Sequence, residues 1–101
     1  MLPYSNKVAL ASNVASMTVS QVTPQNLRNV FAKLGSAISG SAILTITRAG
    51  VTWTIDSQTL SSADTYTFAP TADYPLLCSD VVTLTFGVTA TGSVLIVACP
   101  L

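Results

Sequence analysis

The chain has 101 residues, enough for one domain, and only 8% of them are charged, against about 25% in a typical soluble domain. Four basic and four acidic residues cancel to a formal net charge of zero, so the excess positive charge that nucleic-acid binding needs is missing. Because the sequence lacks both His and Glu, the usual general bases and metal clusters cannot be assembled, and we expect neither an enzyme nor a cofactor.

The first 22 residues carry spaced apolar side chains among small polar ones. Val8, Leu10 and Val14 belong to this set. Its pattern predicts either an extended N-terminal arm or one to two edge strands, which would pair with this chain's own sheet or with a neighbouring subunit. We expect no secretory signal here, since a basic start and a long apolar run are both missing. No 18-residue apolar run occurs either, so we expect no membrane span.

The next element is predicted to be a short α-helix over about residues 24–38. Thr23 suits the cap and Pro24 the first helical position. Apolar residues then recur at helical spacing, at Leu27, Val30, Phe31, Leu34 and Ile38. We expect this stripe to pack against the domain's own core.

From Ser41 onward, apolar and polar residues alternate with the period of half-buried strands. Residues 42–47 and 51–56 flank Arg48-Ala49-Gly50, which predicts a β-hairpin. Trp53 shares a face with Val51 and Ile55 in this pattern, so we expect it in the core.

The remaining elements are also predicted as strands. Residues 65–68 and 82–88 alternate, whereas the segment 70–80 between them carries two prolines and is expected to be an ordered loop. The closing run 93–99 is apolar on both faces, so its outer face, with Leu95 and Val97, needs a cover.

The whole sequence therefore predicts a mainly β protein, an antiparallel β-sandwich or barrel-like domain with one short α-helix and an extended N-terminal arm. Residues 1–22 would form the arm or edge strands, and residues 23–101 a single domain. Cys78 and Cys99 lie in apolar surroundings without a CxxC motif. We expect them to be free and buried, with an intrachain disulfide as the alternative.

Aromatic residues are the one ligand-binding feature in the sequence, because Trp53, Tyr66 and Tyr74 would stack on sugar rings if they were exposed together. Tyr74, beside Pro75 in the expected loop, and Tyr66 are the candidates for contact with a sugar ring. The four Asp residues stand at turn-like positions, where solvation is their ordinary role.

The segments AILTITRAGVTWTID (42–56), TYTFAP (65–70) and YPLLCSDVVTLTF (74–86) resemble small β-sandwich modules in virion proteins of tailed bacteriophages, including head-decoration and fibre proteins. The resemblance covers roughly the last 60 residues. It implies a structural role in the virion, at the capsid surface or tail, and an oligomer.

These observations lead to two functional hypotheses. The first is a capsid decoration or cement protein that binds the major capsid protein or another virion protein. The second is a fibre or adhesin module that binds glycans through its loop aromatics. Sparse charge gives a monomer weak protection against association, although a surface rich in Ser and Thr hydroxyls would also stay solvated. We therefore expect a homo-oligomer, preferably a trimer. Its interface is predicted at Val8, Leu10, Val14, Leu95 and Val97.

Overall fold

The computed structural model describes residues 4–19, 25–70 and 74–100. Every regular element within these ranges is a β-strand. In chain order the strands are β1 (Tyr4–Ala9), β2 (Val14–Thr18), β3 (Gln25–Arg48), β4 (Val51–Phe68), β5 (Pro75–Leu76), β6 (Val81–Phe86) and β7 (Gly92–Pro100). The prediction of a mainly β, antiparallel fold is confirmed.

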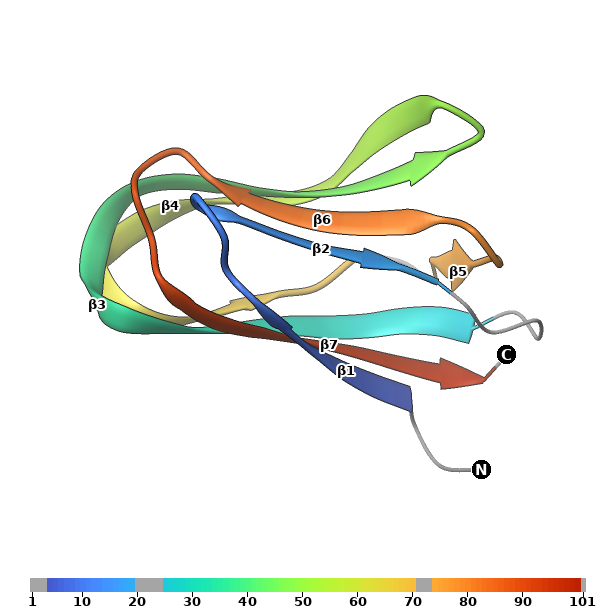
Figure 1. Ribbon diagram of the computed structural model, residues 1–101, viewed down its shortest axis with the longest axis horizontal. Helices are drawn as coiled ribbons and strands as arrows, with labels where there is room; N and C mark the ends of the chain where they lie inside the picture. Colours follow the sequence, from blue (N-terminus) through green and yellow to red (C-terminus); the bar gives the residue numbers. More distant parts are fainter. Residues whose placement is uncertain (1–3, 20–24, 71–73, 101) are drawn as a thin grey trace.

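Two long strands, β3 and β4, bend and so contribute to both layers of the fold (Figure 1). The first part of β3 pairs with β7, which in turn pairs with β1. The second part of β3 pairs with β6, which pairs with β2. β4 follows β3 antiparallel through both parts. We call the layer with β1 and β7 the first layer and the layer with β2 and β6 the second layer.

The bend lies where the pairing of β3 with β4 is irregular, between Lys33 and Ser39. Gly40 follows with a φ of 138°, a conformation that side chains with a Cβ rarely adopt. A Cβ at Gly40 would also collide with the side chain of Val88. The glycine therefore allows the strand to turn from one layer into the other.

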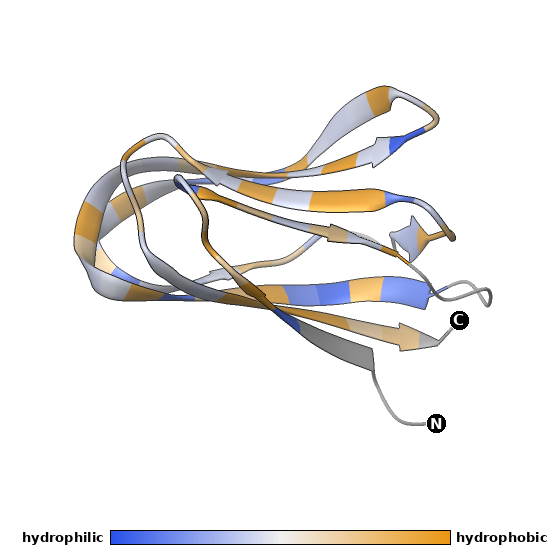
Figure 2. Cartoon of the chain, viewed as in Figure 1, coloured by the Kyte–Doolittle hydropathy of each residue, from blue (hydrophilic) through white to orange (hydrophobic). Residues whose placement is uncertain are grey.

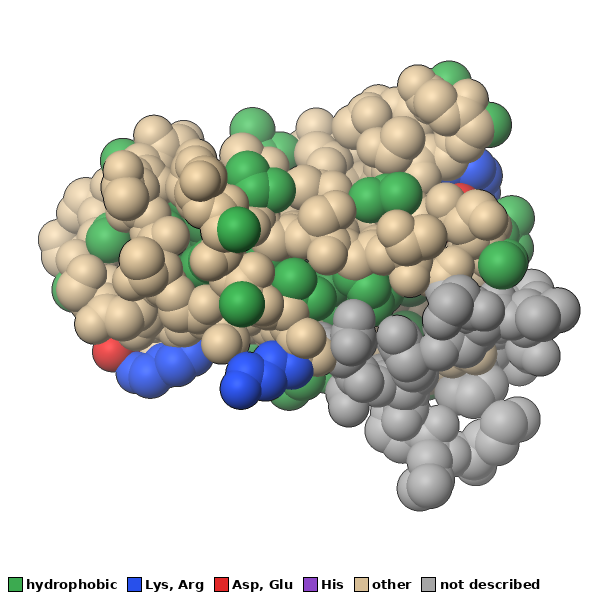
Figure 3. Space-filling view, in the orientation of Figure 1, with side chains coloured by type: hydrophobic (Ala, Val, Ile, Leu, Met, Phe, Trp, Pro, Cys, Tyr) green, Lys and Arg blue, Asp and Glu red, His purple; other side chains and the backbone are tan. Residues whose placement is uncertain are grey.

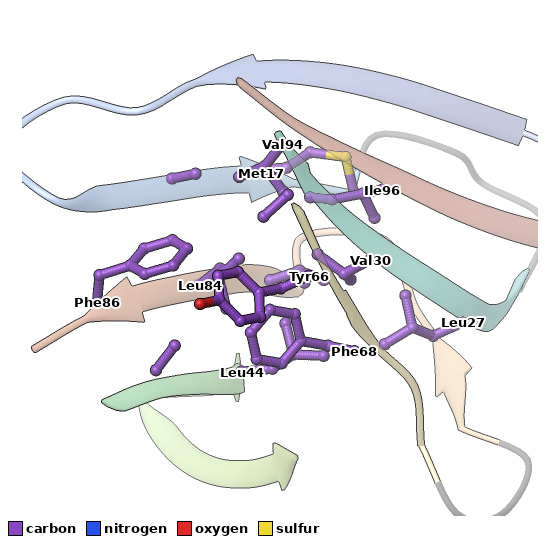
Figure 4. Close-up of a cluster of buried hydrophobic side chains, with 14 of the residues drawn as sticks. Met17, Leu27, Val30, Leu44, Tyr66, Phe68, Leu84, Phe86, Val94 and Ile96 are labelled. Atoms are coloured by element: carbon purple, nitrogen blue, oxygen red, sulfur yellow. The ribbon is translucent and has the colours of Figure 1, made fainter. Parts of the chain in front are cut away.

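The core lies between the two layers, where the inward residues of every long strand meet. Apolar and polar residues alternate along β6 (Figure 2), and its buried positions alternate in the same way, so β6 presents one apolar face to the core. Phe68 and Phe86 are fully buried at the centre, with side chains from both layers around them (Figure 4). The other largest buried apolar side chains are Leu44, Ile46, Leu76, Leu84, Ile96, Val19, Val30, Val82 and Val94.

The predicted helix over residues 24–38 is wrong, because β3 already begins at Gln25. A β-bulge explains the helical spacing: Leu27 pairs with Ala98 and Asn29 with Val97, so Arg28 is an extra residue in the strand. This extra residue places Leu27 and Val30 on the same inward face, although they are three positions apart. The predicted cap, Thr23, and the proline after it lie outside the described residues.

The described part of the N-terminal segment pairs with this chain's own sheet. β1 and β2 lie at the two ends of the strand order, the position that the alternative of edge strands predicts. Val8 and Leu10 are half-buried and pack against the core. They therefore stabilise this chain's own fold.

Candidate functional site

The two tyrosines predicted to bind a ligand do not form a common site. Tyr66 is buried, and its hydroxyl oxygen accepts hydrogen bonds from the N–H groups of Ser61 and Ala63, each at 3.1 Å. The same hydroxyl donates to the carbonyl of Ile38 at 3.1 Å. The hydroxyl of Tyr66 thus makes all its hydrogen bonds within the bend. Tyr74 is half-buried and packs against the core just before β5, near the opposite end of the sandwich (Figure 1).

Trp53 is the aromatic residue that the sequence pattern misplaced. Its side chain is 45% exposed, whereas its cross-strand partner Ile46 is buried. Opposite residues of an antiparallel pair point to the same side, so Trp53 lies on the inward side of β4. The first part of β4 has a neighbouring strand on one side only, β3. At this edge of the second layer the indole is left partly open to solvent.

A second bulge brings polar groups onto the same side of β4 as Trp53. Thr54 pairs with Thr45 and Asp56 with Leu44, which leaves Ile55 as the extra residue. Residues three positions apart in a regular strand point to opposite faces. Because the bulge adds one residue, the side chain of Asp56 points to the same side of β4 as the side chain of Trp53.

The row continues along the strand with Gln58. Gln58 pairs with the buried Ala42 and therefore also points inward. We call Val51, Trp53, Asp56 and Gln58 together the Trp53 edge. At about 3.3 Å per residue, the side chains from Trp53 to Gln58 extend over about 17 Å.

Hydrogen bonds hold the polar side chains of the Trp53 edge. Asp56 accepts from the N–H of Ser57 through Oδ1 at 2.9 Å and from the N–H of Ala69 through Oδ2 at 3.2 Å. The side-chain amide of Gln58 donates to the carbonyl of Thr67. Each Asp56 oxygen has room for a further donor, because a carboxylate accepts about four hydrogen bonds.

An ion pair anchors the hairpin that carries the Trp53 edge. Arg48 donates from Nε to Asp80 Oδ1 at 3.0 Å and from Nη2 to Asp80 Oδ2 at 2.7 Å. The same Nη2 also donates to the carbonyl of Pro75 at 2.9 Å, and the N–H of Leu77 donates to Asp80 at 2.8 Å. The hydrogen bond from Arg48 lowers the pKa of Asp80 below its ordinary value, although burial opposes this. The pair thus fixes the end of β3 to the loop before β6.

The outer side of the first layer presents a different surface. Lys7, Leu95 and Phe31 are direct neighbours across β1, β7 and β3 and all are exposed. Lys33 lies on the same outer side, next to Ser93. We call Lys7, Phe31, Lys33 and Leu95 the basic apolar face. They line an open groove of about 290 Å³ together with Ala32, Thr65, Ser93 and Val94.

Only part of the predicted interface lies on that face. Leu95 is 40% exposed there, and Val97 is half-buried on the same side of β7. Val14 lies on the outer side of the second layer, opposite Thr85. Val8 and Leu10 face the core, as described above. The five residues therefore do not form one patch.

Both cysteines are free thiols in the structure. Cys99 is half-buried, but Cys78 is exposed in the loop after β5, so the expectation of burial was wrong for Cys78. Within residues 4–19, 25–70 and 74–100, no three Cys or Asp side chains gather as metal ligands. The same ranges contain no helix that could span a membrane.

Neither the known sequence families nor the curated proteins contain a match to this chain. Solved structures do share its fold. The NLP core of Drosophila, described for its pentamer formation and histone binding, has a TM-score of 0.61 at 13% identity. That match covers 100% of this chain and 99% of the other.

Two carbohydrate-binding modules have the same fold. The chitosan-binding module 1 of a chitosanase/glucanase from Paenibacillus sp. IK-5 has a TM-score of 0.53 at 15% identity, with 90% of this chain and 74% of that chain covered. The family 32 module of C. perfringens NanJ, solved with galactose, has a TM-score of 0.54 at 8% identity, with 95% and 93% covered. At such identities the likeness shows a shared β-sandwich fold and nothing more specific.

Proposed function

We propose that the chain is a non-catalytic carbohydrate-binding module and that the Trp53 edge is its sugar site. The observation that carries this proposal is the exposed indole of Trp53, 45% open to solvent, on the same side of an edge strand as Asp56. Binding sites for small polar ligands combine an aromatic surface with a few placed polar groups. The Trp53 edge offers this combination.

Sugar chemistry fits the arrangement in two ways. A pyranose ring has a face of C–H groups, which stacks on an indole, and a rim of hydroxyls, which need hydrogen-bond partners. Asp56 would accept from hydroxyls, and such bonds to a charged group are stronger than neutral ones. Gln58 lies further along the same row, so a chain of several sugar units would contact both ends.

The two carbohydrate-binding modules of the same fold support the proposal, because they are binding domains on a similar scaffold. Their ligands, chitosan and galactose, suggest which sugars to test first. The absence of His and Glu from the sequence supports a binding role over catalysis.

Calorimetric titration with chito-, cello- and galacto-oligosaccharides tests the proposal. We expect at least one of the three series to bind, and Trp53→Ala to weaken that binding by about tenfold or more, since stacking aromatics are common hot spots. Ile43→Ala is the matched control, because Ile43 is 41% exposed on the other side of the second layer. Equal affinity in the two variants, or no binding in any series, would contradict a sugar site at Trp53.

We also propose, as a second candidate, that the module is a structural part of a phage virion, for example a capsid decoration protein on the major capsid protein. The exposed apolar pair Phe31 and Leu95 favours this candidate. Exposed apolar side chains that lie next to each other on a sheet commonly mark surfaces that bind another protein. Mass spectrometry and imaging of purified native particles test it. Detection of the chain on the particle surface would support the virion role, and its absence from the particles would exclude it.

A further inference from the structure

We propose that the Trp53 edge takes an oligomer of protonated amino sugar units, such as glucosamine, and that Asp56 binds an ammonium group of this ligand. The inference rests on the proposed sugar site and adds the class of sugar that the site selects. Asp56 decides the class, because its charge is left uncompensated within the chain.

Asp56 is half-buried and carries a negative charge without a cationic partner. Its Oδ1 accepts a hydrogen bond from the N–H of Ser57 and its Oδ2 one from the N–H of Ala69. These backbone groups fix the direction of the carboxylate but have no formal charge. Among the described residues, which include all four basic ones, neither ion pair involves Asp56. About two acceptor positions of the carboxylate remain open.

The basic side chains of the protein lie mainly in the first layer. Three of the four belong to its strands: Lys7, Arg28 and Lys33. Figure 3 shows most of the visible basic side chains along the lower edge of the molecule, where Figure 1 places the first layer. The fourth, Arg48, is bound to Asp80. The uncompensated charge of the second layer is therefore that of Asp56, which attracts a cation to the Trp53 edge.

The pairing of β4 with β3 gives the spacing between the indole and the carboxylate. Trp53 and Asp56 pair with Ile46 and Leu44, which are two positions apart on β3. This spacing corresponds to about 7 Å along the strand. A sugar ring stacked on Trp53 therefore leaves Asp56 to the substituents of the next ring, and a ligand of at least two rings reaches both residues.

An ammonium group suits Asp56 better than a sugar hydroxyl does. A hydroxyl donates one hydrogen bond and leaves the carboxylate charge uncompensated, whereas an ammonium group brings three N–H donors and a full positive charge. Hydrogen bonds between ionised groups are also stronger than those between neutral ones. Because Asp56 is half-buried, salt screens such a pair less than it screens an exposed one.

Three tetramers with the same β-1,4 linkage test the selectivity: glucosamine, N-acetylglucosamine and glucose. They differ at C2, which carries an ammonium, an acetamide or a hydroxyl group. Calorimetric titration at a pH of about 6 keeps Asp side chains ionised and the amine protonated. We expect the glucosamine tetramer to bind about tenfold more tightly than the other two at about 50 mM salt, and this advantage to shrink at about 500 mM.

Asp56→Asn should remove the advantage of glucosamine and leave the binding of the two neutral tetramers within about threefold of the wild type. Asp64→Asn is the matched control. It changes the net charge by the same amount, but Asp64 is 48% exposed at the bend and bound to Lys33. This control should keep the advantage. Circular dichroism checks the fold of both variants, and the salt dependence of the wild type tests the proposal without any substitution.

The outcomes separate the class of sugar from the sugar site itself. Equal binding of the three tetramers, weakened by Trp53→Ala, would overturn the amino-sugar proposal and leave the site standing. No binding of any tetramer would overturn both. An advantage of glucosamine that survives Asp56→Asn would contradict the role of Asp56. A lysine tetrapeptide that binds as tightly as the glucosamine tetramer would show that the edge attracts any cation, and would also overturn the proposal.

Discussion

The two parts of β4 place similar aromatic residues in opposite environments. Phe68, in the part that belongs to the first layer, is fully buried between the layers, whereas Trp53, in the part that forms an edge of the second layer, is 45% exposed. Both follow the same alternation of apolar and polar residues. The difference shows that a strand's position in the sheet, and not its pattern alone, decides whether an aromatic side chain packs in the core or stays partly open to solvent.

The largest loss of stability is expected from a substitution in the part of β4 that belongs to the first layer. Phe68→Ala should lower the free energy of unfolding by about 3–5 kcal/mol, because it leaves a cavity in the centre of the core. Urea denaturation of the wild type and the variant measures this loss. A loss below about 1 kcal/mol would show that Phe68 does not anchor the core.

A smaller effect is expected from the ion pair that anchors the hairpin. Asp80→Asn should lower the free energy of unfolding by about 2 kcal/mol, because Asp80 is buried and the variant removes the negative charge that accepts hydrogen bonds from Arg48. Arg48 is 37% exposed and can recover water contacts, which limits the loss.

The same pair predicts a dependence on pH. The pKa of Asp80 is lower in the folded state than its ordinary value of 3.8. The stabilisation is therefore complete at neutral pH and is lost as the pH falls below about 4 and through the folded pKa. Thermal melts between pH 7 and pH 2 should show a smaller acid destabilisation in Asp80→Asn than in the wild type. Equal pH profiles would contradict this role of Asp80.

The smallest loss of stability is expected at the Trp53 edge. Trp53→Ala should lower the free energy of unfolding by only about 1–2 kcal/mol, because much of the indole is already in water. This corrects the expectation of a core position for Trp53. Urea denaturation alongside Phe68→Ala compares the two parts of β4 directly. If Trp53→Ala were the more damaging change, the contrast between the two parts would be wrong.

Much of the fold was predictable from alternation alone. The hairpin over residues 42–56 and the strands near 82–88 and 93–99 form as expected, and Leu95 and Val97 face outward. In these segments the turns are short or the apolar residues recur at every second position. The local sequence therefore determines which side chains point to the core.

The errors occur where a bulge shifts that period. The extra residue at Arg28 gives Leu27 and Val30 the three-residue spacing of a helix, and the one at Ile55 moves Asp56 to the side of Trp53. A bulge depends on the partner strand, which a single sequence does not reveal. The exposure of Trp53 likewise depends on which strand lies at the edge. The candidate site was therefore hidden from sequence analysis, although its most important residue was noticed.

The most direct test uses the fluorescence of Trp53, which is the single tryptophan of the chain. Without sugar, its emission maximum should lie near that of a partly solvated indole. Titration with an oligosaccharide that binds should shift the maximum to shorter wavelength until the site is saturated. The shift is expected because a stacked sugar ring displaces water from the indole. The midpoint should match the calorimetric dissociation constant and should move to higher sugar concentration in Asp56→Ala. A sugar that binds by calorimetry without changing the Trp53 emission would contradict the assignment of the site to this edge.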